Sequence, residues 1–127
     1  MIKNFLILNC MGKDDKIGLK VDNSFFIHDF DNKIKSNDQL VMSILNLTKK
    51  HKTNFNDNFS ILVNNGPGRF SSIRASLAVA KGIKLSNKIN LFGFKNSDLG
   101  QFNLVNIKLL IAKKLLQKEL IKPLYLS

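Results

Sequence analysis

A chain of 127 residues with 44% hydrophobic and 23% charged residues can bury one core, and this balance excludes wholesale disorder. The net charge of +11 leaves two interpretations open. One is a polyanionic or acidic partner, and the other, which we favour because the lysines are dispersed, is a Lys/Asn-rich composition. The single cysteine, Cys10, excludes an internal disulfide, and no segment approaches the roughly 20 apolar residues of a membrane span. We therefore expect a soluble cytoplasmic protein with no membrane partner.

The first thirty residues contain three β-like runs joined by short turns. The run over 5–8 is continuously apolar, as in a buried strand, and the run over 16–21 alternates polar and apolar residues. A turn at Asp22-Asn23 leads into a third run over 24–30. Short turns between strands predict an antiparallel three-strand start.

Over residues 36–50 the apolar residues recur with the spacing of a helix. Ser36 followed by Gln39 has the spacing of a capping box at the start of this helix. Apolar residues recur along one stripe at Leu40, Ile44 and Leu47.

The second half of the chain alternates strands with helices. Apolar runs over 59–63 and 89–94 predict strands, and the run of small and apolar residues over 69–85 between them predicts a helix and hence a parallel crossover. A basic amphipathic pattern over 104–120, ended by Lys122-Pro123, predicts a helix that packs on the chain's own sheet rather than on a membrane. The predicted fold is α/β, with a mixed five-stranded sheet that starts antiparallel and continues parallel, and helices packed on it.

The turn before the second helix, Gly66-Pro67-Gly68, is the most informative stretch. Pro67 fixes its own φ, and Gly68 is free to take a positive φ. A glycine turn before a helix is a potential anion site, but this turn lacks the lysine of a P-loop and the third glycine of a dinucleotide fingerprint. On local features we favour the alternative, a sharp strand-to-helix turn whose helix is capped by Ser71 or Ser72.

Small residues recur four apart along the second helix. The sets are Ser72, Ser76 and Ala80, then Ser71 and Ala75, then Ala78 and Gly82. One small face must pack on the sheet, and another is suited to the close approach of a partner helix. The alternative, in which every small face is buried within the monomer, stays open at this stage.

Catalytic groups do not assemble into a recognisable site. His28 and His51 lack metal-ligand spacing, and no base is nominated beside Cys10. The pair Asp14-Asp15 is interpreted as solvated turn residues. We therefore predict no catalytic residues, no metal and no tightly bound cofactor.

From Val63 to Ile83 the sequence resembles the TsaB family, also called YeaZ, whose Gly-Pro-Gly-Ser-Phe-Thr-Gly-x-Arg segment runs into a helix with Ala-Lys-Gly. The matching residues are Gly66, Pro67, Gly68, Phe70, Arg74, Lys81 and Gly82. A looser likeness covers the residues over 6–10, Lys35-Ser36-Asn37 and Pro123-Leu124-Tyr125-Leu126.

The resemblance implies that residues 1–127 form a single actin-like, ribonuclease-H-like lobe, a shortened member that lacks most of the second lobe. It implies a non-catalytic scaffold for a TsaD-like enzyme that forms threonylcarbamoyladenosine in tRNA, with tRNA contacted indirectly. A TsaE-like ATPase is a further candidate partner, and ATP is expected only at the complex with the TsaD-like protein.

In the family, the capped helix and the helix after the corner pair with equivalent helices of TsaD, or with a second copy in a homodimer. The interface that this implies comprises Ser36, Leu40, Gly66, Pro67, Gly68, Arg69, Phe70, Ser71, Ser72, Arg74, Ala75, Ser76, Ala78 and Gly82.

The sequence also departs from the family pattern. Arg69, Ser71 and Ser72 replace a serine, a threonine and a glycine, which predicts a wider helix contact. Asn9-Cys10 stands where the family usually has Asp-Thr, and the lost carboxylate argues against ATP hydrolysis. Two other hypotheses follow from the residues: a basic tRNA- or RNA-binding module, suggested by the charge, and, ranked last, an actin-like nucleotide-binding ATPase.

Overall fold

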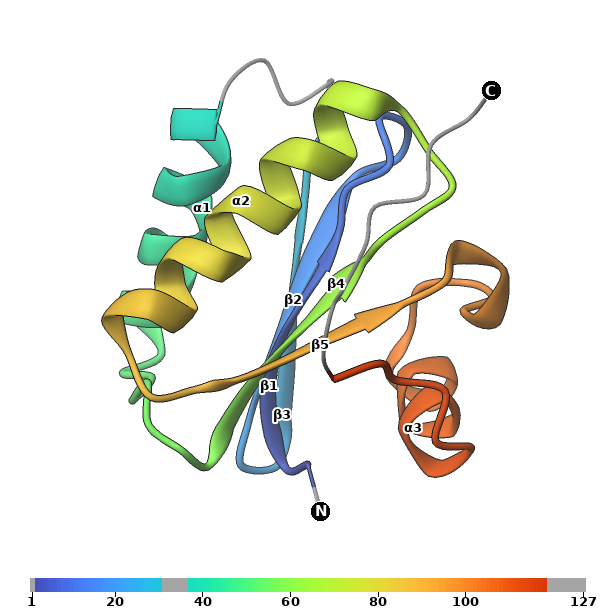
Figure 1. Ribbon diagram of the computed structural model, residues 1–127. Helices are drawn as coiled ribbons and strands as arrows, with labels where there is room; N and C mark the ends of the chain where they lie inside the picture. The colour runs from blue at the N-terminus through green and yellow to red at the C-terminus, as the bar shows by residue number, and fades with distance from the viewer. Residues whose placement is uncertain (1, 31–36, 119–127) are drawn as a thin grey trace.

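The computed structural model describes residues 2–30 and 37–118, which form one twisted sheet with helices on both faces (Figure 1). In chain order, the strands and helices are β1 (Asn4–Asn9), β2 (Lys16–Val21), β3 (Ser24–Asp29), α1 (Asn37–Lys50), β4 (Phe59–Asn64), α2 (Phe70–Ser86), β5 (Asn90–Phe94), the short 3-10 helix η1 (Asn96–Asp98) and α3 (Leu104–Ala112).

The five strands lie in the order β3-β2-β1-β4-β5. The first three strands pair antiparallel, and β1–β4 and β4–β5 pair parallel, which confirms the predicted mixed sheet. The registers align Leu6 with Ile61 and Ile61 with Leu91. The central strands β1 and β4 are covered on both faces, which explains why their sequences are continuously apolar rather than alternating.

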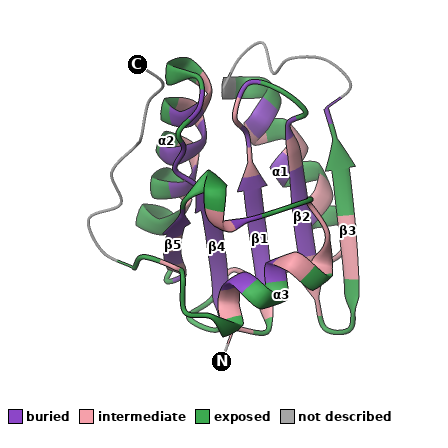
Figure 2. Ribbon diagram, turned by 90° about the vertical axis from the view of Figure 1, so that its right-hand side faces the viewer, coloured by how far each residue is buried: buried purple, intermediate pink, exposed green. Residues whose placement is uncertain are grey.

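Alternate residues of these strands enter two separate cores. Helices α1 and α2 lie side by side over one face of the sheet, where Leu6, Leu8 and Ile61 point (Figure 1). Helix α3 covers the other face, where Phe5 and Ile7 point. Edge strand β3 is the most exposed strand, as Figure 2 shows. The period of two along each strand thus divides the apolar side chains between the two helical layers.

The helix predicted over 104–120 is shorter than its amphipathic pattern suggested. It ends at Ala112, because Lys114 takes a left-handed conformation with φ 57° and the chain turns back. Gln117 then exchanges two 2.8 Å backbone hydrogen bonds with Gly93 on the free side of β5. These two bonds pair the backbone N–H and C=O groups of Gly93 at the edge of the sheet, and a longer helix could not supply them. The predicted end at Pro123 lies outside the described residues.

The other elements begin and end within two residues of the predicted bounds. Ser36 lies outside the described residues, so the structure does not describe its predicted capping box with Gln39. Across residues 2–30 and 37–118, no helix has the length and apolar character needed to cross a membrane.

Candidate functional site

The corner between β4 and α2 is an irregular turn that reorients the chain from the sheet into a helix. The Gly66–Pro67 peptide bond is cis, and Gly66 has a φ of 106°, which a side chain would disfavour. Arg69 is the N-cap residue of α2, in an extended conformation, and makes no side-chain capping bond. The prediction that Ser71 or Ser72 caps this helix is therefore wrong, because both lie inside its first turn.

Backbone hydrogen bonds hold the corner from two sides. On one side, the Arg69 amide donates to the Met11 carbonyl at 3.1 Å, which joins the corner to the β1–β2 loop. On the other, the Asn96 amide donates to the Gly66 carbonyl at 2.8 Å. The loop lies close to Gly68, because a Cβ there would lie 3.3 Å from the Met11 carbonyl oxygen. The direction in which α2 leaves the sheet is thus fixed by two neighbouring loops.

Asparagine side chains link the ends of three parallel strands beneath the corner. The Asn64 amide nitrogen donates to Oδ1 of Asn9 at 2.7 Å and to Oδ1 of Asn96 at 3.0 Å. Oδ1 of Asn64 accepts from the Gly66 amide at 3.0 Å. Asn64 is fully buried, so these three bonds offset the cost of removing its amide from water.

The β1–β2 loop contains a carboxylate that sequence reasoning placed in solvent. Asp15 is buried, and its Oδ1 accepts hydrogen bonds from the amides of Met11 at 2.8 Å and Gly12 at 2.9 Å. Asp14 alone of the pair is exposed. The sequence did contain a signal for this role. An aspartate side chain can accept hydrogen bonds from backbone amides three or four residues earlier in the chain, and Asp15 has this spacing to Gly12 and Met11.

Cys10 lies at the end of β1 and is buried. Burial raises the pKa of the Cys10 thiol far above its ordinary value, and the negative charge of Asp15 raises it further. The protonated thiol is a poor nucleophile and a poor metal ligand.

The hydrogen-bonded side chains beneath the corner are the neutral amides of Asn64 and its partners, and the charged groups beside it include Arg69 and Asp15. Within the described parts of the chain, no group of three His, Cys, Asp or Glu side chains is placed to hold a metal ion. At the end of β1, Oδ1 of Asn9 accepts a hydrogen bond from the Asn64 amide nitrogen. These bonds fix the shape of the turn that leads into α2.

Beyond the corner, α1 and α2 present an outward face that their own sheet does not cover. The predicted interface residues on its exposed part are Pro67, Arg69, Phe70, Ser71, Arg74, Ala78 and Gly82, and Ser72 and Ala75 are half-buried. Phe70 keeps 54% of its surface exposed, and the Arg74 guanidinium lies 5.0 Å from the centre of its ring. A large aromatic side chain at the start of this face is well suited to binding.

Four residues of the predicted interface are not accessible on this face. Leu40 and Ser76 are buried in the core, and the Ser76 hydroxyl donates to the Ile73 carbonyl at 3.1 Å. Gly66 and Gly68 are buried within the corner. The structure therefore removes Leu40 and Ser76 from the accessible part of the predicted interface, because their helical positions face the sheet.

A shallow groove of about 370 Å³ runs between the two helices. Its walls include Val41 and Leu45 of α1 and Val79 and Gly82 of α2. Leu45 is 49% exposed, and Met42 beside it is 55% exposed. Met42 was not predicted as a surface residue. Its helical position lies away from the buried stripe of Leu40, Ile44 and Leu47, which indicates exposure.

These features define an α/β protein with the actin-like, ribonuclease-H-like fold. Among solved structures, the chain is similar to YeaZ from Pseudomonas aeruginosa, with a TM-score of 0.65 and 15% identity over 73% of this chain and 44% of that one. It is equally similar to an uncharacterized protein with similarity to peptidase YEAZ from Pseudomonas aeruginosa, at 0.65 and 15% over 73% and 43%. The chain thus matches less than half the length of these structures. No family model and no curated protein matches it.

Gly12 tests how closely the loop must approach the corner. It has a φ of 95°, and a Cβ there would lie 2.4 to 2.9 Å from the Arg69 side chain. We expect Gly12→Ala to lower the free energy of unfolding by at least about 1–2 kcal/mol. Gly82→Ala is the matched control, because nothing lies within 4 Å of its Cβ, and it should stabilise α2 by about 0.5–1 kcal/mol. Urea denaturation of both variants measures the two effects, and equal stabilities would contradict the close approach.

Cys10 gives the stability a specific dependence on pH. A thiol with a raised folded pKa contributes stability that is complete below its unfolded pKa of about 8.5 and is lost as pH rises above it. Between pH 8.5 and 10 we expect the parent protein to lose about 1.5–2 kcal/mol more unfolding free energy than Cys10→Ala, which lacks this titration. Urea denaturation at both pH values checks the difference, and parallel losses would show that the folded thiol titrates normally.

Proposed function

We propose that this protein is a non-catalytic cytoplasmic scaffold that binds a TsaD-like enzyme and supports the formation of threonylcarbamoyladenosine in tRNA. The observation that carries the proposal is the outward face of α1 and α2. The corner that sets the direction of α2 has the sequence pattern of the TsaB family, and the fold is that of YeaZ.

Helical geometry favours a helix as the occupant of this face. Ser71, Ala75, Ala78 and Gly82 follow one stripe of α2 at spacings of four, three and four residues. Their small side chains permit close approach of a partner backbone, while the groove beside them accepts larger apolar side chains. The inward stripe that contains Ser76 and Ala80 is used by the chain's own core, so the two small faces of α2 have different roles.

The other partners in this proposal are those that the resemblance to the TsaB family implies. A second copy of the chain is a competing occupant of the face, because the resemblance to the TsaB family implies a homodimer through the same two helices. A TsaE-like ATPase and tRNA would then join through the TsaD-like subunit, and ATP would bind only in that complex. The neutral amides at Asn9 and Asn64 support a role without nucleotide hydrolysis.

Ala78→Glu tests the proposed interface. The residue is exposed on α2, so the monomer should keep its fold, whereas a carboxylate buried in a helix–helix contact would lack a partner. We expect affinity for the cognate TsaD-like protein to fall at least about thirtyfold, or about 2 kcal/mol, in sedimentation or calorimetric titration.

Val105→Glu provides the matched control, because it adds the same charge at a residue of α3 that is 69% exposed. It should bind like the parent chain. Equal binding by both variants, with circular dichroism showing both folded, would overturn the interface. Failure of the parent chain to bind a TsaD-like protein at all would overturn the proposed function.

A second candidate function is RNA binding, which one further surface favours. The His51 ring stacks on Phe26 at 3.5 Å between centroids and 12° between planes, beside the run Lys49-Lys50 at the end of α1. A groove of about 570 Å³ adjoins this stack. Flat rings next to cations are the groups that bind unstacked bases and phosphates.

An unmodified tRNA transcript tests this second candidate by fluorescence anisotropy. Its affinity should fall steeply between 50 and about 200 mM salt. His51→Ala and Lys50→Ala should each weaken binding at least about fivefold, since stacking is worth about 1–3 kcal/mol per base, and Lys95→Ala, which removes an exposed lysine elsewhere, should have little effect. Equal effects of all three substitutions would indicate only non-specific attraction.

A further inference from the structure

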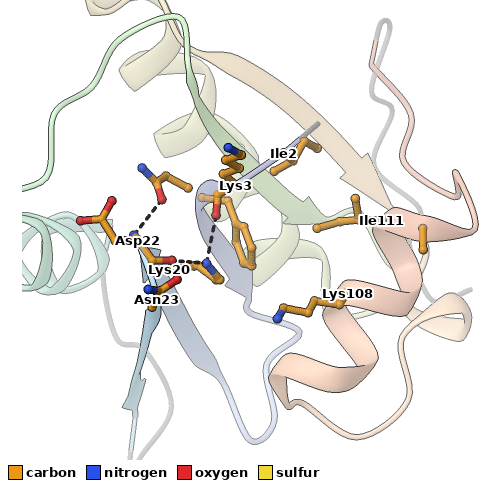
Figure 3. A pocket seen from close by; sticks show the side chains of 10 residues that line it. Ile2, Lys3, Lys20, Asp22, Asn23, Lys108 and Ile111 are labelled. Carbon is orange, nitrogen blue, oxygen red and sulfur yellow. Dashed lines mark hydrogen bonds between the residues drawn. The ribbon is translucent and has the colours of Figure 1, made fainter.

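A hollow on the opposite side of the molecule from the proposed interface combines an apolar floor with three lysines. It has a volume of about 710 Å³ and lies between the start of β1, the β2–β3 turn and the end of α3 (Figure 3). Ile2, Phe5 and Ile111 contribute apolar surface. The lysines are Lys3, just before β1, Lys20 of β2 and Lys108 of α3.

Hydrogen bonds fasten the wall that carries Lys20. The Asp22 amide donates to Oδ1 of Asn4 at 2.9 Å, which joins the β2–β3 turn to the start of β1. The Lys20 ammonium donates to the Lys3 carbonyl at 3.4 Å and to the Asp22 carbonyl. Two main-chain oxygens thus hold this cation beside the hollow, and it keeps a third N–H for a ligand.

Positive charge predominates among the described residues that line the hollow. In the described part of the protein, the ion pair is Lys16 with Asp29, and none of the three lysines pairs with a carboxylate. Asp22 is the one acidic residue in the lining, which leaves a local net charge of +2 from three lysines and one aspartate. Figure 3 shows Lys108 extending from α3 toward the side of the hollow where Lys20 lies.

From this arrangement we propose that the hollow binds a small organic anion, one acidic group on an apolar chain or ring. The lysines bind the carboxylate, phosphate or sulfonate, and the apolar body covers Ile2 and Ile111, which are half-buried and leave apolar surface exposed to water. Neither part alone is sufficient, because exposed lysines bind simple anions weakly and the apolar floor is small.

The fluorescent sulfonate 1-anilinonaphthalene-8-sulfonate tests the proposal on the full chain. We expect saturable binding that Lys108→Glu and Lys3→Glu each weaken at least about tenfold, since charge reversal turns attraction into repulsion. Lys88→Glu is the matched control, because Lys88 lines a second lysine-rich hollow beside α2, and it should change the affinity by less than about twofold. Circular dichroism verifies that each variant is folded.

Competition separates the two parts of the ligand. Decanoate should displace the probe, whereas the same concentration of sulfate should not, because sulfate lacks an apolar body. If sulfate by itself displaces the probe, the hollow binds simple anions without any apolar contribution, and the proposal is overturned. Loss of binding in Lys88→Glu but not in Lys108→Glu would place the probe elsewhere and also overturn it. Neither result depends on whether the α1 and α2 face binds a partner.

Discussion

The buried side chain of Asn64 is the constraint on which the corner depends. Its amide group joins Asn9, Asn96 and the Gly66 amide, so one residue ties together the ends of β1 and β4, the turn after β5 and the start of the corner. An amide can do this without a counter-ion, because it both donates and accepts. A carboxylate at Asn9 would place a charge in this network and would need a cation or solvent to balance it. The shape of the corner is therefore held by uncharged hydrogen-bonding groups.

Fixing the corner fixes the two faces of α2. Once Arg69 is bonded to Met11, the helical period places Ile73, Leu77 and Ala80 over the sheet and leaves the stripe through Ala78 in solvent. The same small-residue composition thus serves an internal contact on one side and an open surface on the other. The wider side chains at Arg69 and Ser72 lie at the start of the helix, where Arg69 packs against Gly12 rather than across the open face.

Local sequence patterns predict much of this fold. The strands were predictable because β1 and β4 are continuously apolar, and the parallel crossover followed from the strand, turn and helix around Gly66. The end of α3 was not, because its apolar spacing continues to Leu115 while Lys114 turns the chain so that Gln117 can pair with Gly93. That pairing joins residues far apart in the sequence, so the spacing of apolar residues within the helix does not predict it. Asp15 was misjudged for a similar reason, since its burial depends on the corner that packs over its loop.

The assignment of residues to surfaces shows the same division between local and tertiary information. A repeat of small residues indicates that α2 can pack closely but not which stripe packs on its own sheet, so Ser76 and Ala78 are equivalent in the sequence and opposite in the structure. The hollow between the start of β1, the β2–β3 turn and α3 is a stronger case, because Lys3, Lys20 and Lys108 are far apart in the sequence and share no motif. The dispersed lysines, which suggested only compositional bias, become a local concentration of charge when the sheet and α3 bring them together. Dispersal along the chain is therefore weak evidence against a charged site, since tertiary structure decides which charges are neighbours.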